Sequence, residues 1–141
     1  MLGPHLTLDF YNCNKENLKN AEFIYSILDE LPDIIGMTKL TKPSLLIYEG
    51  KENSFDKGGI SGFVIIAESH IAIHTFVEQR FASVDIFSCK DFDFEKVTVY
   101  LLEKLNAEKV EKNLINRGIE FPRDLKLAEV IINRQRSKIE F

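Results

Sequence analysis

Three strand-like segments follow one another in the middle of this chain with almost no sequence between them. Residues 60–67, 69–76 and 80–88 are rich in β-branched and aromatic residues, as strands are. The three-residue link at 77–79 suits a hairpin, whereas parallel strands need a crossover of about a dozen residues or more. The chain is therefore predicted to build a mainly antiparallel sheet.

Further strands and a few amphipathic helices flank this central run on both sides. The expected elements are a strand at 5–13, a helix at 15–31 capped by Asn14 and ended by Pro32, a strand at 38–49 with an edge or bulge at Pro43, a helix at 94–106 capped by Asp91 or Asp93, a strand at 108–116, and a third helix after Pro122. Such a pattern favours an α+β fold, a two-layer sandwich with the helices packed on one face of the sheet. The uncovered face needs a partner, so we expect a homodimer.

The composition fits a single domain over residues 1–141. With 45% apolar residues among 141, the chain is long enough to bury a core of its own. The net charge of −4 and the lack of a basic block argue against nucleic acid or an anionic membrane surface as partners. No apolar run reaches the roughly 20 residues of a membrane helix, and neither a signal-like leader nor a disulfide framework is present. We therefore expect a cytoplasmic protein.

The segment AESHIAIHT, residues 67–75, carries side chains that a buried strand normally avoids. Ser69, His70 and His74 could be metal ligands, part of a hydrolase, hydrogen-bonded sheet residues without chemistry, or a place where the chain reacts with itself. On a strand the two histidines lie about 13 Å apart, too far to share an ion with bonds of about 2 Å, so no metal site is expected here. A hydrolase is disfavoured because Ser69 lacks a Gly-x-Ser-x-Gly elbow. The last two alternatives stay open.

Neighbouring segments place further reactive residue types near strand ends. Ser61 opens the preceding strand beside a glycine, Cys89 follows the strand at 80–88, and Glu78 lies in the intervening turn. A cysteine at a strand end beside a loop is more accessible than a buried one and can exchange a proton. The ordinary alternatives are a small apolar residue for the cysteine and a solvated carboxylate for the glutamate.

The spacing of these motifs resembles that of one known family. The segments ISG, AESHIAIHT, FVE and SVDIFSC, with the opening GPHLTLDFYNCN, are similar to the small prokaryotic S-adenosylmethionine decarboxylases. Members of that family have a Gly-x-Ser-Gly strand start, Glu-Ser-His-x-x-Ile-His-Thr, a glutamate four residues past the second histidine, and a cysteine ending the next strand. The resemblance is strong over residues 59–89 and looser over most of the remaining chain.

The resemblance implies that the chain cuts itself between Glu68 and Ser69, giving a β chain of residues 1–68 and an α chain of residues 69–141. The Ser69 hydroxyl would attack the Glu68 carbonyl, and an N→O acyl shift followed by β-elimination would leave a pyruvoyl group at residue 69. Such a step needs a strained or polarised peptide and a base for the serine α-proton. By resemblance, His74 is the processing histidine and Ser61 assists it. The resemblance gives His70 no such role, and we expect it to be a sheet residue that helps to shape the site.

The same resemblance implies roles in turnover. The pyruvoyl carbonyl derived from Ser69 would form a Schiff base with S-adenosylmethionine and accept the electrons left by CO₂ loss, without pyridoxal phosphate. Cys89 corresponds to the proton donor, Glu78 to the carboxylate that binds the ribose hydroxyls, and Phe55 to an aromatic ring against adenine. The product would supply aminopropyl groups for spermidine biosynthesis.

The chain departs from the family pattern around the presumed substrate. Residues 76–80, FVEQR, stand where Trp-Pro-Glu-Tyr-Gly is usual; Lys57 replaces a common proline and Lys90 a usual glycine. Two alternatives therefore stay open. One is a pyruvoyl-dependent decarboxylase of arginine or ornithine, and the other is a homologue that has lost processing and serves as a binding or regulatory subunit.

Overall fold

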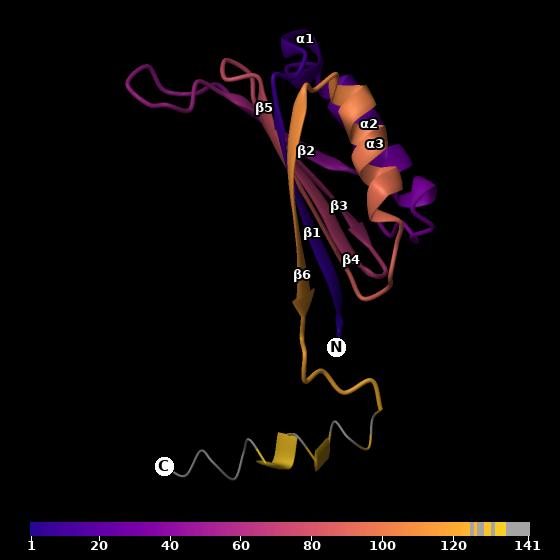
Figure 1. Cartoon of the computed structure of the whole chain (residues 1–141). Helices are drawn as coiled ribbons and strands as arrows, with labels where there is room; N and C mark the ends of the chain where they lie inside the picture. The colour runs from indigo at the N-terminus through magenta and orange to yellow at the C-terminus, as the bar shows by residue number, and fades with distance from the viewer. Residues whose placement is uncertain (125, 127–128, 131, 135–141) are drawn as a thin grey trace.

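The computed structural model describes residues 1–124, 126, 129–130 and 132–134, and within them six strands form one sheet (Figure 1). The strands are β1 (Gly3–Tyr11), β2 (Ser44–Tyr48), β3 (Gly59–Ile66), β4 (Ser69–Phe76), β5 (Phe81–Ser88) and β6 (Lys109–Arg117). Their order is β2-β3-β4-β5-β1-β6, and each neighbouring pair is antiparallel. The predicted antiparallel α+β fold is confirmed, and β3, β4 and β5 begin and end within one residue of their expected limits.

The helix expected over residues 15–31 is in fact two helices, α1 (Lys15–Leu18) and α2 (Ala21–Ile34). Asn14 caps the first as expected, but the side chain of Asn20 accepts a hydrogen bond from the Phe23 N–H and starts a second helix. Pro32 does not end α2, which continues for two more residues. Proline costs the helix one backbone hydrogen bond, but its fixed φ of about −65° is helical, so α2 can run two residues past it before it ends.

The remaining helix, α3 (Phe94–Leu105), begins where Asp93 accepts a hydrogen bond from the Lys96 N–H. The third helix expected after Pro122 includes residues 125, 127–128, 131 and 135–136, which lie outside the described residues. Among the helices that the structure describes, none combines the length and apolar character that a membrane crossing requires.

The strand expected over residues 38–49 is shorter than predicted. β2 begins at Ser44, directly after Pro43, because proline has no N–H to donate to a ladder. Ahead of the proline, Lys39 forms an isolated bridge with Ile66. The chain therefore joins the sheet edge at two separate places instead of along one continuous strand.

The core lies between the sheet and the two longer helices. Along β1, Leu6, Leu8 and Phe10 are buried and alternate with partly exposed residues on the opposite side, as the period of a strand requires. Gly62 of β3 allows α2 to pack closely, because a Cβ at this position would lie only 2.9 Å from Cδ1 of Leu28. The buried apolar side chains of the sheet thus lie under the helices.

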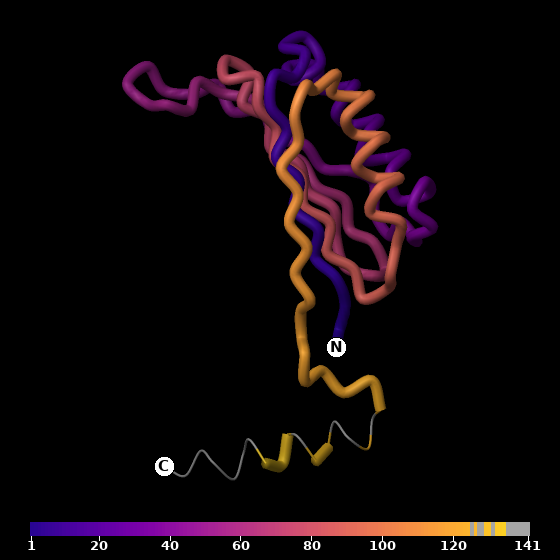
Figure 2. Tube along the Cα trace, in the orientation of Figure 1, coloured from indigo at the N-terminus to yellow at the C-terminus, as the bar shows by residue number. Residues whose placement is uncertain are grey.

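The opposite face of the sheet carries no helix in the described residues. Figure 2 shows α2 and α3 on one side of the sheet only, while the loop between β2 and β3 projects toward the other side. Exposed apolar side chains lie on this bare side: Leu46 (73% exposed), Phe63 (46%), Ile65 (37%) and Ile115 (52%). We call this whole side of the sheet, on which Leu46, Phe63, Ile65 and Ile115 lie, the open face.

Candidate active site

The backbone is strained at Ser69, the first residue of β4. Its φ is +151°, whereas the other described non-glycine residues with positive φ, Asn12, Arg80 and Asn106, lie at 48–53° in the ordinary left-handed region. A φ near +150° belongs to a region that is used essentially by glycine, and holding another residue there costs on the order of 1–3 kcal/mol. The strain therefore lies beside the peptide that the sequence predicts to be cut.

The carbonyl of this peptide is also polarised. The backbone N–H of Cys89 donates a hydrogen bond of 2.8 Å to the carbonyl oxygen of Glu68. The Glu68 side chain is anchored as well, because its carboxylate accepts a hydrogen bond of 3.1 Å from the Thr38 N–H. A donor aimed at a carbonyl oxygen stabilises the negative charge that develops there when a nucleophile attacks the carbon.

Cys89 lies beside this peptide because Ser69 pairs with Ser88 across the ladder between β4 and β5. It is partly exposed and lines a surface pocket of about 370 Å³ together with Leu2, Phe121, Pro122 and Arg123. The other cysteine differs: burial raises the pKa of the Cys13 thiol to about 11. Of the two thiols, Cys89 is the one that a small molecule can reach, as the strand-end position predicts.

Ser61 and His74 form a pair on the open face. They lie directly opposite each other on β3 and β4, and Ser61 Oγ is 2.9 Å from His74 Nδ1. His74 is exposed, and it lies five residues along β4 from Ser69, or about 17 Å at 3.3 Å per residue. The structure therefore brings the two expected processing residues together, but within one chain it does not bring them to Ser69.

Glu78 and Phe55 lie at the far end of β4. Seven strand steps, about 23 Å, separate Ser69 from Phe76, which precedes the turn containing Glu78. The Glu78 carboxylate accepts a hydrogen bond of 2.9 Å from Lys15 Nζ. Phe55, 79% exposed, lines a mostly apolar pocket of about 320 Å³ with Tyr11, Phe76, Gln79 and Phe81. A flat aromatic ligand suits this pocket, yet in a single chain it is remote from Ser69.

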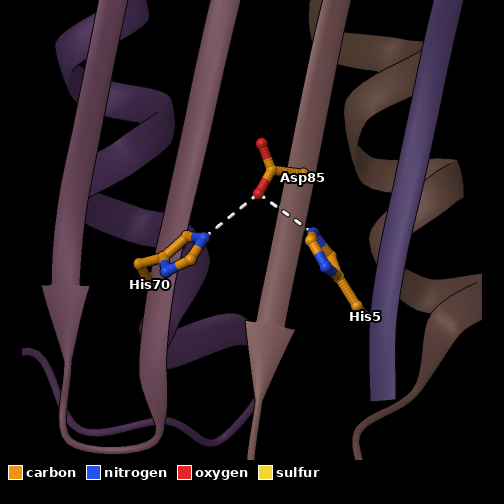
Figure 3. Close-up of side chains that lie close together, drawn as sticks. All are labelled: His5, His70 and Asp85. Carbon is orange, nitrogen blue, oxygen red and sulfur yellow. Dashed lines mark hydrogen bonds and ion pairs between the residues drawn. The ribbon is translucent and has the colours of Figure 1, made fainter. Parts of the chain in front are cut away.

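One cluster of polar side chains is not predicted by the sequence patterns. His5 of β1, Asp85 of β5 and His70 of β4 meet on the open face, where both histidines point at one carboxylate oxygen (Figure 3). The Nε2–Oδ2 distances are 3.1 Å for His5 and 3.2 Å for His70. Strand alternation puts each residue on this face, but only the pairing of β1 with β5 brings His5 next to the others.

Fold and site together define the class: a two-layer α+β protein with a strained Glu-Ser peptide at a hairpin and a thiol beside it. The family model described as S-adenosylmethionine decarboxylase matches residues 4–118 of this chain. The chain therefore belongs to the S-adenosylmethionine decarboxylase family, and the resemblance drawn from the motifs is confirmed.

Individual relatives agree with this assignment. The S-adenosylmethionine decarboxylase proenzyme of Clostridium botulinum (strain Loch Maree / Type A3) is 38% identical over 117 residues, which cover 82% of this chain and 94% of that protein. The proenzyme of the same name from Clostridium kluyveri is 36% identical over 119 residues, covering 84% and 88%. The crystal structure of the adenosylmethionine decarboxylase from Aquifex aeolicus superposes with a TM-score of 0.66 at 28% identity, covering 87% of this chain and 95% of that one.

Proposed function

We propose that this chain is a self-processing S-adenosylmethionine decarboxylase whose pyruvoyl group derives from Ser69. The observation that carries the proposal is the strained peptide at Ser69, whose Glu68 carbonyl accepts a hydrogen bond from the Cys89 N–H. The family membership and the word proenzyme in the names of the relatives support it. The product serves as aminopropyl donor for spermidine biosynthesis, and the enzyme works in the cytoplasm.

Self-cleavage begins when the Ser69 hydroxyl loses its proton and its oxygen attacks the Glu68 carbonyl carbon. Negative charge on the carbonyl oxygen is stabilised by the Cys89 N–H, the C–N bond breaks, and the nitrogen takes up a proton. Glu68 is then held as an ester on Ser69 Oγ. A base removes the Ser69 α-proton, and the ester oxygen leaves with Glu68 as a carboxylate, which gives a dehydroalanine at residue 69. Its Cβ takes up a proton to give an imine, and water hydrolyses the imine to the pyruvoyl carbonyl and ammonia. Relief of the strained φ favours this sequence over the intact peptide.

In turnover, the pyruvoyl carbonyl supplies the electron sink that decarboxylation of an α-amino acid needs. The residues around it bind the substrate and manage the proton. The Cys89 thiol, one residue beyond the ladder partner of Ser69, delivers a proton to the substrate carbon. Glu78 binds the ribose hydroxyls with charge-assisted hydrogen bonds, and Phe55 stacks against adenine.

A second copy of the chain completes the site in this proposal. Ser69 and Cys89 lie at one end of the sheet, while Glu78 and Phe55 lie at the other, and His74 faces out from the open face between them. Two copies related by a two-fold axis, with open faces together and strands antiparallel, place the Ser69 end of one copy over the Glu78 end of the other. The exposed Leu46, Phe63 and Ile115 support this contact, because it removes their apolar surface from water.

Denaturing mass spectrometry of the purified protein tests the cleavage. We expect two fragments, residues 1–68 and 69–141, with a carbonyl reactive toward hydrazine at the start of the second. A Ser69→Ala chain should stay intact and release no CO₂, whereas Cys89→Ala should still be cut, because it keeps the backbone N–H that contacts Glu68. A wild-type chain that never splits, or turnover by Ser69→Ala, contradicts the proposal.

The substrate is tested by offering S-adenosylmethionine, ornithine and arginine in parallel and measuring released CO₂. We expect release from S-adenosylmethionine. Preference for arginine or ornithine would keep the chemistry and change the substrate. An intact chain that releases CO₂ from none of the three would identify a homologue without processing.

A further inference from the structure

The three residues His5, His70 and Asp85, called the open-face cluster below, come from three neighbouring strands. Across the sheet, His5 and His70 both lie opposite Phe87, while Asp85 lies two residues away on the same strand, β5. Each histidine therefore reaches the carboxylate diagonally from its own side. Figure 3 shows both rings converging on one oxygen of Asp85, on the side of the sheet away from the helices.

The open-face cluster brings three potential metal ligands close together. The imidazole nitrogens lie 3.1 and 3.2 Å from the same carboxylate oxygen, and one ligand atom from each of the three residues lies within 4.8 Å of the others. Ligand atoms bound tetrahedrally at about 2.0–2.1 Å are roughly 3.3 Å apart. Two of the three separations match this value and the remaining one lies within 4.8 Å, so a small side-chain adjustment lets all three atoms reach one ion.

The kinds of ligand select the kind of ion. Two imidazoles and one carboxylate suit zinc and its neighbours cobalt and nickel, whereas magnesium and calcium prefer oxygen ligands throughout. The side chains are 19%, 38% and 32% exposed for His5, His70 and Asp85 in the single chain, and in the dimer proposed above a fourth ligand comes from the space between the two open faces. The aromatic ring of Phe87 packs against both imidazoles, at centroid distances of 5.5 and 6.0 Å, and orients them.

We propose that His5, His70 and Asp85 bind one divalent transition-metal ion of the zinc class. The pair that sequence spacing rules out, His70 with His74, is not involved, because β4 is a strand and keeps those two apart. His5, brought in by β1, is the second imidazole instead. Since His70 directly follows Ser69, a bound ion would fix His70 beside the strained peptide. The metal site does not require that the chain be cut.

The test is a titration of the full-length protein with Co²⁺ and Zn²⁺. Binding is measured by calorimetry and, for Co²⁺, also by visible absorption. We expect one ion per chain and the strong visible bands of four-coordinate cobalt without a thiolate charge-transfer band. His5→Ala, His70→Ala and Asp85→Asn should each weaken metal binding at least about 10-fold. Loss of a residue that only supports a ligand already costs about 10-fold in affinity, and loss of the ligand itself should cost at least as much. Thr7→Ala is the matched control, since Thr7 is on β1 directly opposite Asp85 and is not a ligand.

Two further variants keep the outcome decisive. Cys89→Ser removes the accessible thiol, and Ser69→Ala keeps the chain uncut; both should bind metal as the wild type does. No binding to the wild type, equal affinity in the His5 and Thr7 variants, or loss of binding with Cys89→Ser alone would each overturn the proposal. Asp85→Asn retains the shape of the side chain, so it answers the question even where His5→Ala fails to fold. Because binding is measured on the uncut Ser69→Ala chain as well, its failure is distinguishable from a failure of self-processing.

Discussion

Ser69 keeps its unusual φ because both of its flanks are fixed. On one side, Glu68 is held by the Thr38 N–H and the Cys89 N–H; on the other, Ser69 pairs with Ser88 as β4 begins. The surrounding structure therefore enforces a conformation that an isolated serine would leave. The same contact that fixes the carbonyl also polarises it, so strain and activation arise from one arrangement.

Replacing Ser69 by glycine or by alanine separates strain from chemistry. Both variants lack the hydroxyl and should remain uncut, but glycine adopts a φ of +151° without strain. Glycine relieves a backbone strain of about 1–3 kcal/mol in the folded state. It also destabilises the fold by about 0.4–1 kcal/mol, because its unfolded chain is more flexible. Ser69→Gly should therefore unfold in urea with a free energy about 1 kcal/mol above that of Ser69→Ala. Equal stability of the two variants would show that the backbone is relaxed there.

The two cysteines should react at very different rates. With a pKa of about 11 and no exposed surface, Cys13 is a thiolate in only about one molecule in a thousand at pH 8 and is sterically protected. Brief iodoacetamide treatment of the native protein should label Cys89, located by peptide mass spectrometry, and leave Cys13 free until denaturant is added. Similar labelling of both thiols in the native protein would contradict this structure around Cys13.

At the scale of elements, the strands were predictable and the boundaries depended on local chemistry. The alternation in β3, β4 and β5 identified them because one face is buried under helices. Asn20 was overlooked as a second cap because the apolar helical spacing runs on past it. Cys89 next to Ser69 follows from hairpin pairing, which the short link implies. His5 beside Asp85 could not be found, because it depends on pairing strands that are far apart in the sequence.

Strand β6 opposes β1 with two like charges face to face. Asp9 and Glu111 are directly opposite in the register, and burial, followed by the charge of Glu111, raises the pKa of Asp9. A raised carboxyl pKa means that the folded state binds more protons than the unfolded state just above pH 3.8, so the Asp9 charge costs stability as pH rises.

Asp9→Asn should therefore stabilise the fold at pH 7 and lose this advantage near pH 3.5. Asp9 is only partly buried, so the gain after solvent screening is at most about 0.5 kcal/mol. Urea unfolding at both pH values measures it. A gain of the same size at both pH values would show that the charge of Asp9 is not the cause.

At the scale of the whole molecule, a sheet with one bare face explains why expected site residues are spread over its length. The Ser69 end and the Glu78 end are separated by β4, and no internal motion of a strand brings them together. The site shared between two copies that we propose would reconcile the motif with the geometry. It would also make the contributions of Ser69 and His74 separable, because each site would take its Ser69 from one copy and its His74 from the other.

Co-expression of a His74→Ala chain with a Ser69→Ala chain tests this sharing. Neither chain should be cut when expressed alone. In the mixed dimer, one site combines the intact Ser69 of the first chain with the intact His74 of the second, so with random pairing about half of the His74→Ala chains should be cut. Mass spectrometry distinguishes the chains by mass. If no His74→Ala chain is cut in the mixture while the wild type is processed, His74 does not act across the dimer.

The strand order determines how two fragments cut at Glu68 would be held together in the sheet. A break after Glu68 assigns β1, β2 and β3 to one polypeptide and β4, β5 and β6 to the other, and in the sheet these alternate, two of the first, two of the second, then one of each. Three ladders, β3–β4, β5–β1 and β1–β6, join one fragment to the other. Neither fragment can therefore dissociate without breaking their hydrogen bonds. After the proposed cleavage, refolding from the unfolded state would require two separate polypeptides to associate, because the covalent link between them would be gone.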